Sequence, residues 1–483
     1  MYTEAAYQAL VEDIFRRFPS VQKDGFSTGA YKPGLERMRS FEEALGHPSR
    51  QFRSIHIAGT NGKGSVANML ASALSSCGLR TGLFTSPHLI DFRERMVIAT
   101  EEINTPSVAD KMADAPSGVL TSSDDSPCHS ASLCHSERSE ESSLISKEYV
   151  FDFLTEWMPW IEEHELSFFE ITTGLAFKWF ADQKVDVAVI ETGLGGRLDS
   201  TNILERPVLT IVTTIGFDHM AQLGNTLPAI AAEKAGIFKA GVPALVGEWQ
   251  AETAPVFEAH RPLTFADRVQ PSLWERHTEI LREMDLQADV QEKNLRTVLA
   301  AIDWLRPVFP ALSNSEALLQ GIIHTARNMG FHGRWERLQE RPLVLADIGH
   351  NAHALRHNFA QLESLMQSGR HDALIIVYGI MADKDLDAIL PLMPRQATYI
   401  FTTPNTPRAL PAAEILRRYV TCRGAESACP GDSSGGGQAS GDALSAAIVP
   451  DAVKKALALA TPDTLIYIGG STFVVADALP LFQ

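Results

Sequence analysis

A glycine-rich loop between an apolar run and a helix-like stretch is the feature that most constrains this chain of 483 residues. The loop, Gly59-Thr60-Asn61-Gly62-Lys63-Gly64-Ser65, directly follows the run Ile55–Ala58 and leads into Val66–Leu74. A strand that delivers a glycine turn to a helix N-terminus aligns free backbone N–H groups with the positive end of the helix dipole. The sequence therefore predicts a phosphate-binding site at this turn.

Two side chains of the loop add specific chemistry. Lys63 supplies a mobile cation for the β- and γ-phosphates of a nucleotide, and Ser65 supplies a hydroxyl for Mg²⁺. The spacing differs from the common pattern G-x-x-x-x-G-K-[ST], because two residues separate Gly59 from Gly62 and Gly64 precedes the serine. We interpret the segment as a variant phosphate loop, and an ordinary glycine turn is the alternative.

Length and composition fit a globular protein of two or three domains. The formal net charge of −17 argues against non-specific binding to nucleic acid or to an anionic membrane. No apolar run approaches the length of a membrane span, and the N-terminus lacks the pattern of a signal peptide. The five cysteines are scattered, which is not typical of a disulfide framework. We therefore expect a cytoplasmic monomer with small-molecule partners.

Apolar β-rich runs alternate with helix-period segments, which predicts mostly parallel sheets covered by helices. The expected strands of the first half are Ile55–Ala58, Thr81–Phe84, Val185–Ile190, Leu209–Thr213 and Ala244–Val246. Those of the second half are Leu343–Asp347, Ala373–Tyr378, Thr398–Phe401 and Leu465–Ile468. The predicted fold class is α/β, with a P-loop-containing, mostly parallel sheet domain and a second, smaller α/β domain.

The predicted domains are residues 1–310 and 325–483, because prolines and Asn314-Ser315 interrupt the pattern between Pro307 and Gly333. Two segments are interpreted as flexible insertions: 114–147 is rich in Ser, Asp and Glu, and 429–442 is rich in Gly and Ser. The first contains the repeat Cys128-His129 and Cys134-His135. We interpret this repeat as accidental, because structural zinc sites draw their ligands from compact turns.

Polar side chains follow two further expected strands. Glu191 comes directly after Val189-Ile190, and the pair Asp218-His219 follows Leu209–Thr213. Ligand sites in open α/β sheets lie at the carboxyl ends of the strands, so Glu191 is well placed to hold Mg²⁺ beside nucleotide phosphates. A solvated strand-end glutamate and a structural histidine are the alternatives. A solvent-exposed face is expected at Asp91, Glu94, Glu101 and Glu102.

Several motifs occur in a characteristic order. They are GTNGKGS, Thr85-Ser86-Pro87-His88-Leu89 with Phe92-Arg93-Glu94-Arg95, ETGLGGRLDSTN, DHMAQLGNTLPAIAAEKAGIFK, HGRWE, DIGHN and GIMADKD. In order and spacing the set resembles the folylpolyglutamate synthase/dihydrofolate synthase family of the Mur ligase superfamily. One departure is DIGHNA at Asp347–Ala352, where the family has DGAHNP; we expect the shape of this loop to differ more than its chemistry.

The resemblance implies an ATP-dependent ligase that adds L-glutamate to dihydropteroate, folate or both through an acyl phosphate, releasing ADP and phosphate. It implies two Mg²⁺ ions and leaves room for K⁺. Catalytic roles fall on Lys63, Glu191, His219, Lys234 as a carbamate, Arg334 and His350. Nucleotide contacts fall on the loop Gly59–Ser65, Asn294, Arg334 and Asp347, and metal contacts on Ser65, Ser86, Glu191, His219 and Lys234.

Other functions explain less of the sequence. A P-loop kinase fits GTNGKGS but leaves ETGLGGRLDSTN and the second domain unexplained. A non-catalytic nucleotide-binding protein would not need Lys63, Glu191 and His219. Within the superfamily, a cell-wall Mur-type amino-acid ligase is the runner-up, and the folate-type motifs disfavour it.

Overall fold

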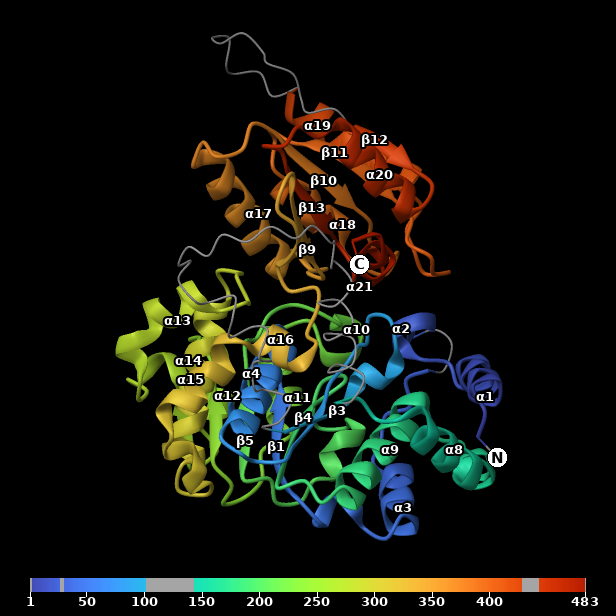
Figure 1. The fold of residues 1–483 in the computed structure, drawn as a ribbon, viewed down its shortest axis with the longest axis vertical. Helices are drawn as coiled ribbons and strands as arrows, with labels where there is room; N and C mark the ends of the chain where they lie inside the picture. Colours follow the sequence, from blue (N-terminus) through green and yellow to red (C-terminus); the bar gives the residue numbers. More distant parts are fainter. Residues whose placement is uncertain (1, 27–29, 101–142, 428–442, 483) are drawn as a thin grey trace, which may run out of the picture.

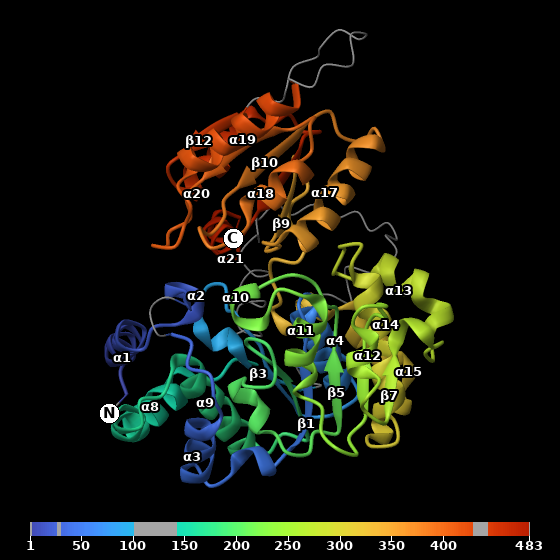
Figure 2. The same ribbon diagram turned by 180° about the vertical axis from the view of Figure 1, so that it is seen from behind.

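Two sheets, each covered by helices, form two lobes of the molecule (Figure 1). The computed structural model describes residues 2–26, 30–100, 143–427 and 443–482. Of these residues, the first lobe holds those up to the end of α16 (Thr325–Met329), and the second, drawn in orange and red, holds those that follow (Figures 1 and 2). In the part of the chain that the structure describes, no helix combines the length and the apolar character needed to cross a bilayer.

The first sheet has seven strands in the order β3-β2-β4-β1-β5-β6-β7. Neighbouring strands are parallel except for the pair β2 and β3. The order places β1 in the middle, between β4 and β5, so the loops after these three strands meet at one edge. The strands are β1 (Arg53–Ala58), β2 (Thr81–Phe84), β3 (Met96–Ala99), β4 (Val187–Glu191), β5 (Leu209–Val212), β6 (Ala244–Val246) and β7 (Leu263–Phe265).

The strands of this sheet are apolar on both faces, as expected for a parallel sheet between two layers of helices. Ile55, Ile57 and Val189 pack in one core with α4 (Lys63–Ser76), α14 (Gln291–Leu305) and α15 (Ser315–Ile323). On the opposite face, Ala188 and Ile190 pack in a second core with α3 (Glu36–Ala44), α8 (Lys147–Glu163) and α9 (Phe168–Asp182). The remaining helices of this lobe are α1 (Glu4–Arg17), α2 (Val21–Asp24), α10 (Met220–Leu223), α11 (Leu227–Ala235), α12 (Ala254–Phe257) and α13 (His277–Glu283).

The second sheet has six strands in the order β12-β11-β10-β13-β9-β8, and only β8 and β9 are antiparallel. Its strands are β8 (Glu336–Gln339), β9 (Leu343–Asp347), β10 (Leu374–Tyr378), β11 (Thr398–Thr402), β12 (Ala443–Ala446) and β13 (Leu465–Gly469). Its helices are α17 (Ala352–Gln367), α18 (Leu386–Ile389), α19 (Ala412–Ser427), α20 (Val449–Leu459) and α21 (Thr472–Ala478). Both lobes therefore have the predicted α/β fold class. The division into domains 1–310 and 325–483 stays a prediction. Helix α16, at the start of the predicted second domain, packs in the core of the first lobe through Met329.

Two sequence predictions are wrong in detail. Asp91 and Glu94 do not form a solvated face: Asp91 caps a short helix, and the Glu94 carboxylate accepts hydrogen bonds from three backbone N–H groups at 2.6–2.8 Å. The insertion predicted at 114–147 does not extend to Lys147, because Ile145 is fully buried and donates its N–H to the Met96 carbonyl at 3.1 Å. Residues 114–142 and 429–442, the Cys-His repeat, Glu101 and Glu102 lie outside the described residues.

Candidate active site

The phosphate loop passes so close to its neighbours that two of its positions require glycine. Gly59 and Gly62 have φ values of +154° and +82°. A Cβ atom at Gly59 would lie 1.9 Å from Oγ1 of Thr213, and one at Gly62 would lie 2.4 Å from Oδ1 of Asn294. Thr213 also donates its hydroxyl to the Asn61 carbonyl at 2.6 Å. The loop is therefore held tightly by the elements behind it, and α4 begins at its Lys63.

Lys63 and Glu191 face each other where β1 and β4 end. Their Nζ and Oε1 atoms are 3.9 Å apart, and the backbone N–H of Ser86 donates to Oε2 of Glu191 at 3.2 Å. Glu191 is only 3% exposed. Burial raises the pKa of its carboxyl, against the opposing effects of Lys63 and of the Ser86 N–H. A buried carboxylate beside a phosphate loop can contribute negative oxygen ligands to a divalent cation.

Lys234, on α11, is the most buried cation at this edge of the sheet among the predicted site residues. The residue is 4% exposed, and its Nζ atom donates a hydrogen bond to the Gly59 carbonyl at 2.7 Å. Burial and the nearby Lys63 lower the pKa of Lys234 to about 7. A large fraction of the amine is therefore uncharged at neutral pH.

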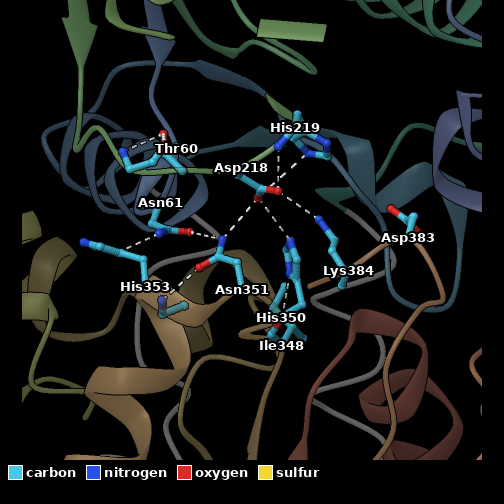
Figure 3. A network of polar contacts seen from close by, with 12 residues as sticks. Thr60, Asn61, Asp218, His219, Ile348, His350, Asn351, His353, Asp383 and Lys384 are labelled. Atoms are coloured by element: carbon cyan, nitrogen blue, oxygen red, sulfur yellow. Dashed lines mark hydrogen bonds and ion pairs between the residues drawn. The ribbon is translucent and has the colours of Figure 1, made fainter. Parts of the chain in front are cut away.

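Asp218 is the centre of a polar network that joins the two lobes (Figure 3). Its carboxylate accepts hydrogen bonds from Lys384 at 3.0 Å and from Asn351 at 3.1 Å, both of the second lobe. The rings of His350 and His219 approach it to 3.7 and 3.9 Å. Burial alone would raise the pKa of Asp218, but His350, His219 and Lys384 hold it well below its usual range. The carboxylate is therefore ionised, and it connects both lobes at one point.

His219 sits in a strained backbone position beside this network. Its φ is +48°, in the left-handed region that non-glycine residues rarely adopt. Its ring meets the ring of Phe26 edge to face at 5.6 Å. Burial lowers the pKa of His219 to about 4, against the effect of Asp218. The neutral imidazole keeps a lone pair, which is the form that binds metals.

The second lobe brings Arg334 to the phosphate loop. Its Nη2 atom lies 3.5 Å from the position that a Cβ at Gly64 would take, and its guanidinium lies 4.8 Å from the ring centre of Phe331. The carboxylate of Asp347, by contrast, forms its hydrogen bonds within its own lobe. It accepts the backbone N–H of Trp335 at 3.0 Å and of Gly349 at 2.8 Å. Asp347 therefore shapes the loop that follows β9.

The departure DIGHNA retains the functional end of this loop. Asn351 caps α17, because its Oδ1 accepts the N–H of Ala354 at 2.9 Å, and its amide also donates to Asn61 and Asp218. Ala352 takes the first position of the helix, where proline is tolerated and alanine is equally compatible. The helix therefore starts in place without the proline.

Asn294 and Ser65 lie on the other side of the phosphate loop. The Asn294 amide donates to Oε1 of Gln291 at 2.8 Å, and the Gln291 amide donates to Ser65 Oγ at 3.5 Å. Thr60 donates its hydroxyl to the Gly216 carbonyl at 3.1 Å. The structure thus brings Asn294 against Gly62, while its contact with a nucleotide base stays a prediction.

One cavity of about 270 Å³ is lined by four of the six predicted catalytic residues, Lys63, His219, Lys234 and His350; Glu191 and Arg334 are not among its lining residues. It extends along the first lobe to Tyr31, Phe168 and Phe169, so an apolar wall adjoins the charged end. The sequence pattern placed Asp218 beside His219 at a strand end but assigned it no role of its own. The residues of the charged end are Lys63, Ser86, Asp218, His219, Lys234, His350 and Lys384.

Within the described ranges, no three or more His, Cys, Asp or Glu side chains are grouped so that they could hold a metal ion by themselves. The available donors are a buried carboxylate at Glu191, a neutral imidazole at His219 and the hydroxyls of Ser65 and Ser86. This set fits a divalent cation that shares oxygen atoms of a bound nucleotide, and it does not fit a closed structural metal site.

A phosphate loop that faces Lys384 and Arg334 of a second α/β lobe is the arrangement expected of an ATP-dependent ligase of the Mur type. Residues 333–472 match the family model described as Mur ligase, glutamate ligase domain. The chain is 32% identical over 405 residues to the dihydrofolate synthase/folylpolyglutamate synthase of Bacillus subtilis, covering 80% of this chain and 84% of that relative. The chain belongs to the folylpolyglutamate synthase/dihydrofolate synthase family, as its motifs predict.

Solved structures share the fold over nearly the whole chain. The folylpolyglutamate synthase of Mycobacterium tuberculosis, complexed with ADP, superposes with a TM-score of 0.74 at 24% identity and covers 99% of this chain and 98% of its own. A bifunctional enzyme from Yersinia pestis, complexed with AMPPNP and an Mn ion, has a TM-score of 0.70 at 23% identity over 94% and 95% of the two chains. These similarities confirm the predicted two-domain α/β fold.

Proposed function

We propose that this enzyme adds L-glutamate to dihydropteroate, to a reduced folate, or to both, with ATP as the energy source. The observation that carries the proposal is the single cavity in which the phosphate loop of the first lobe faces Lys384 and His350 of the second. The ion pair between Lys384 and Asp218 is 3.0 Å long and joins the two walls. ATP, an acceptor carboxylate and glutamate would meet between these walls.

The phosphate loop and two cations would bind the nucleotide. The N–H groups at the start of α4 and the ammonium of Lys63 face the phosphate position, and Arg334 approaches from the second lobe beside Gly64. These groups would stabilise the negative charge that spreads over the transferred phosphoryl group. Support for the nucleotide comes from the related enzymes that were solved with ADP and AMPPNP.

Glu191, His219, Ser65 and Ser86 would hold Mg²⁺ together with phosphate oxygens. When bound, the ion would offset the charge of the phosphates. Glu191 is suited to this task because its buried carboxylate has a single cation, Lys63, within 4 Å among the described residues. The number of ions and a role for K⁺ remain part of the proposal.

The acceptor carboxylate must be activated before an amine can attack it, because a carboxylate does not condense with an amine at neutral pH. Transfer of the γ-phosphoryl group gives an acyl phosphate and ADP. The amino group of glutamate then attacks the acyl carbon, and phosphate leaves. Lys384 and His350, next to the ionised Asp218, are positioned to bind the anionic substrates on the side of the second lobe.

Lys234 would act as a carbamate. Its pKa of about 7 leaves an uncharged amine that can add CO₂, and burial next to Gly59 shields it from bulk water. The product would be a carboxylate-like group close to the phosphate loop. ¹³C-NMR in the presence of ¹³CO₂ tests this step, because a carbamate signal that is absent from Lys234→Met would identify the modified residue.

The assay of the proposed function pairs ADP release with incorporation of labelled glutamate. Dihydropteroate and tetrahydrofolate are supplied separately, and we expect equal amounts of ADP and amide product with at least one of them. Lys63→Ala should be inactive, whereas Lys178→Ala on the surface of α9, which removes an ion pair with Asp182, should retain activity. Phosphoryl transfer without glutamate incorporation would favour the kinase alternative and contradict the proposal.

A further inference from the structure

We propose that Arg408, a residue of the second lobe, is a positioning residue that holds one wall of the substrate cavity in the first lobe. The proposal rests on the ligase function proposed above. Arg408 lines the cavity together with Val21 and Gln22 of helix α2. Figures 1 and 2 both show α2 on the surface of the first lobe that faces the second.

The contacts of Arg408 are directed at the backbone of α2. Its Nη1 atom donates to the carbonyls of Val21 at 2.9 Å and of Gln22 at 2.6 Å, and Nη2 donates to Asp383 of its own lobe. The side chain is only 17% exposed. A helix of four residues is too short to be stable alone. The Val21 carbonyl also accepts the N–H of Gly25 at 3.2 Å, so Arg408 adds a second donor to this carbonyl and a donor to that of Gln22. Arg408 supplies donors and positive charge at that end.

The backbone after α2 is shaped to receive this guanidinium. Gly25 has a φ of +71°, and a Cβ atom there would lie 3.1 Å from Nε of Arg408. A side chain at this position would therefore strain the backbone and press on the guanidinium. The glycine allows the planar group to pack directly against the chain.

Gln22 extends the contact deeper into the first lobe. Its amide nitrogen donates to the His88 carbonyl at 2.9 Å, and its amide oxygen accepts from Nη2 of Arg95 at 2.6 Å. Arg95 also lines the cavity. The position of α2 therefore influences the position of a buried cation in the cavity wall.

The segment that carries Arg408 is rigid. Its carbonyl accepts the N–H of Ala382 at 2.9 Å, and the next turn is fixed by the bond from Leu410 N–H to the Ile380 carbonyl at 2.9 Å. Lys384 lies two residues after Ala382, which is paired with Arg408, and forms the ion pair with Asp218. One piece of the second lobe thus contacts the reacting end through Lys384 and the cavity wall through Arg408.

The first test separates positioning from catalysis. We expect Arg408→Gln to raise the KM for the acceptor about tenfold, the equivalent of about 1.4 kcal/mol, while kcat and the KM for ATP change less than twofold. Arg408→Lys, which keeps the charge and one donor, should restore part of the loss. The matched control is Arg417→Gln, which removes an exposed arginine of α19 whose partner Glu414 lies on the same helix.

The second test requires no activity. Lys23 is an exposed residue of α2, so trypsin should cleave after it faster in Arg408→Gln than in the wild type or in Arg417→Gln. Faster cleavage in an enzyme that ligates neither acceptor would refute the proposed function and retain the positioning role. Unchanged cleavage at Lys23, or an equal rise in the KM for ATP and acceptor, would overturn the role of Arg408.

Discussion

Replacing Lys234 with methionine should stabilise the protein while it abolishes ligation. Lys234 is buried, and its one hydrogen bond goes to the Gly59 carbonyl at 2.7 Å. Methionine has a similar length and no charge, so it can fill the same space in the wall of the cavity. A buried lysine that lowers the stability of the fold is expected at a reaction site, where the side chain is retained for its chemistry and not for packing.

The size of the effect follows from the pKa. The ordinary value of 10.5 falls to about 7 because of burial and Lys63. Between these two pH values the unfolded chain binds a proton that the native state does not bind, so the free energy of unfolding rises with pH. At 1.36 kcal/mol per pH unit, the penalty at pH 7 and below is about 4–5 kcal/mol. The lost hydrogen bond offsets about 1–2 kcal/mol of the gain, which leaves Lys234→Met more stable at pH 7 by about 3 kcal/mol.

Urea denaturation at pH 7.0 and at about pH 9.5 measures the stability difference between the variant and the wild type and its change with pH. The wild type should gain stability over this interval, and Lys234→Met should gain several kilocalories per mole less. Lys178→Met is the control, because it removes a surface lysine with an exposed carboxylate partner. A Lys234→Met variant that is less stable than the wild type at pH 7, with an unchanged pH slope, would show that the folded protein holds Lys234 as a charged, compensated group.

Three further substitutions test the remaining roles. Lys63→Ala should reduce ligation by at least a thousandfold without lowering the melting temperature, since its described contacts are limited to Glu191 and the Thr60 carbonyl; circular dichroism and the ligation assay check this. Glu191→Gln should raise the Mg²⁺ concentration needed for half-maximal rate about tenfold or more, and an unchanged titration would contradict the metal role. Asp218→Asn should cost about 2–4 kcal/mol in urea denaturation, because Lys384 is left buried without its carboxylate.

The parts of the fold and the site that follow local rules could be predicted from the sequence. Strands β2, β6 and β9 have the expected bounds, because each is an apolar run closed by turn residues. The phosphate loop was also predictable, since its glycines and lysine are contiguous. Strands β3, β7, β8 and β12, the edge strands of the two sheets, were not predicted. The last three are partly exposed, so no buried apolar run marks them in the sequence.

The contacts that connect the lobes could not be predicted, because the residues that form them are far apart in the sequence. Asp218 and Lys384 are 166 residues apart, and Arg408 and Val21 are 387 apart. Nothing in the local pattern of either segment indicates these contacts. Asp218 is also adjacent to His219, and a histidine at a strand end has the more familiar catalytic and metal-binding roles.

The distribution of charge explains why the site is shared between two lobes. The chain as a whole carries a net charge of −17, yet its reaction cavity is lined by basic side chains from both sides: Lys63 and the partly uncharged Lys234 from the first lobe, Lys384 and Arg408 from the second. Placing all of them in one lobe would add mutual repulsion there; burial is the main cause of the lowered pKa of Lys234, and Lys63 lowers it further. Dividing them lets each lobe fold with tolerable repulsion. The basic side chains of both lobes then meet in the cavity between them, where closure of the lobes over bound substrates would keep water from an acyl phosphate.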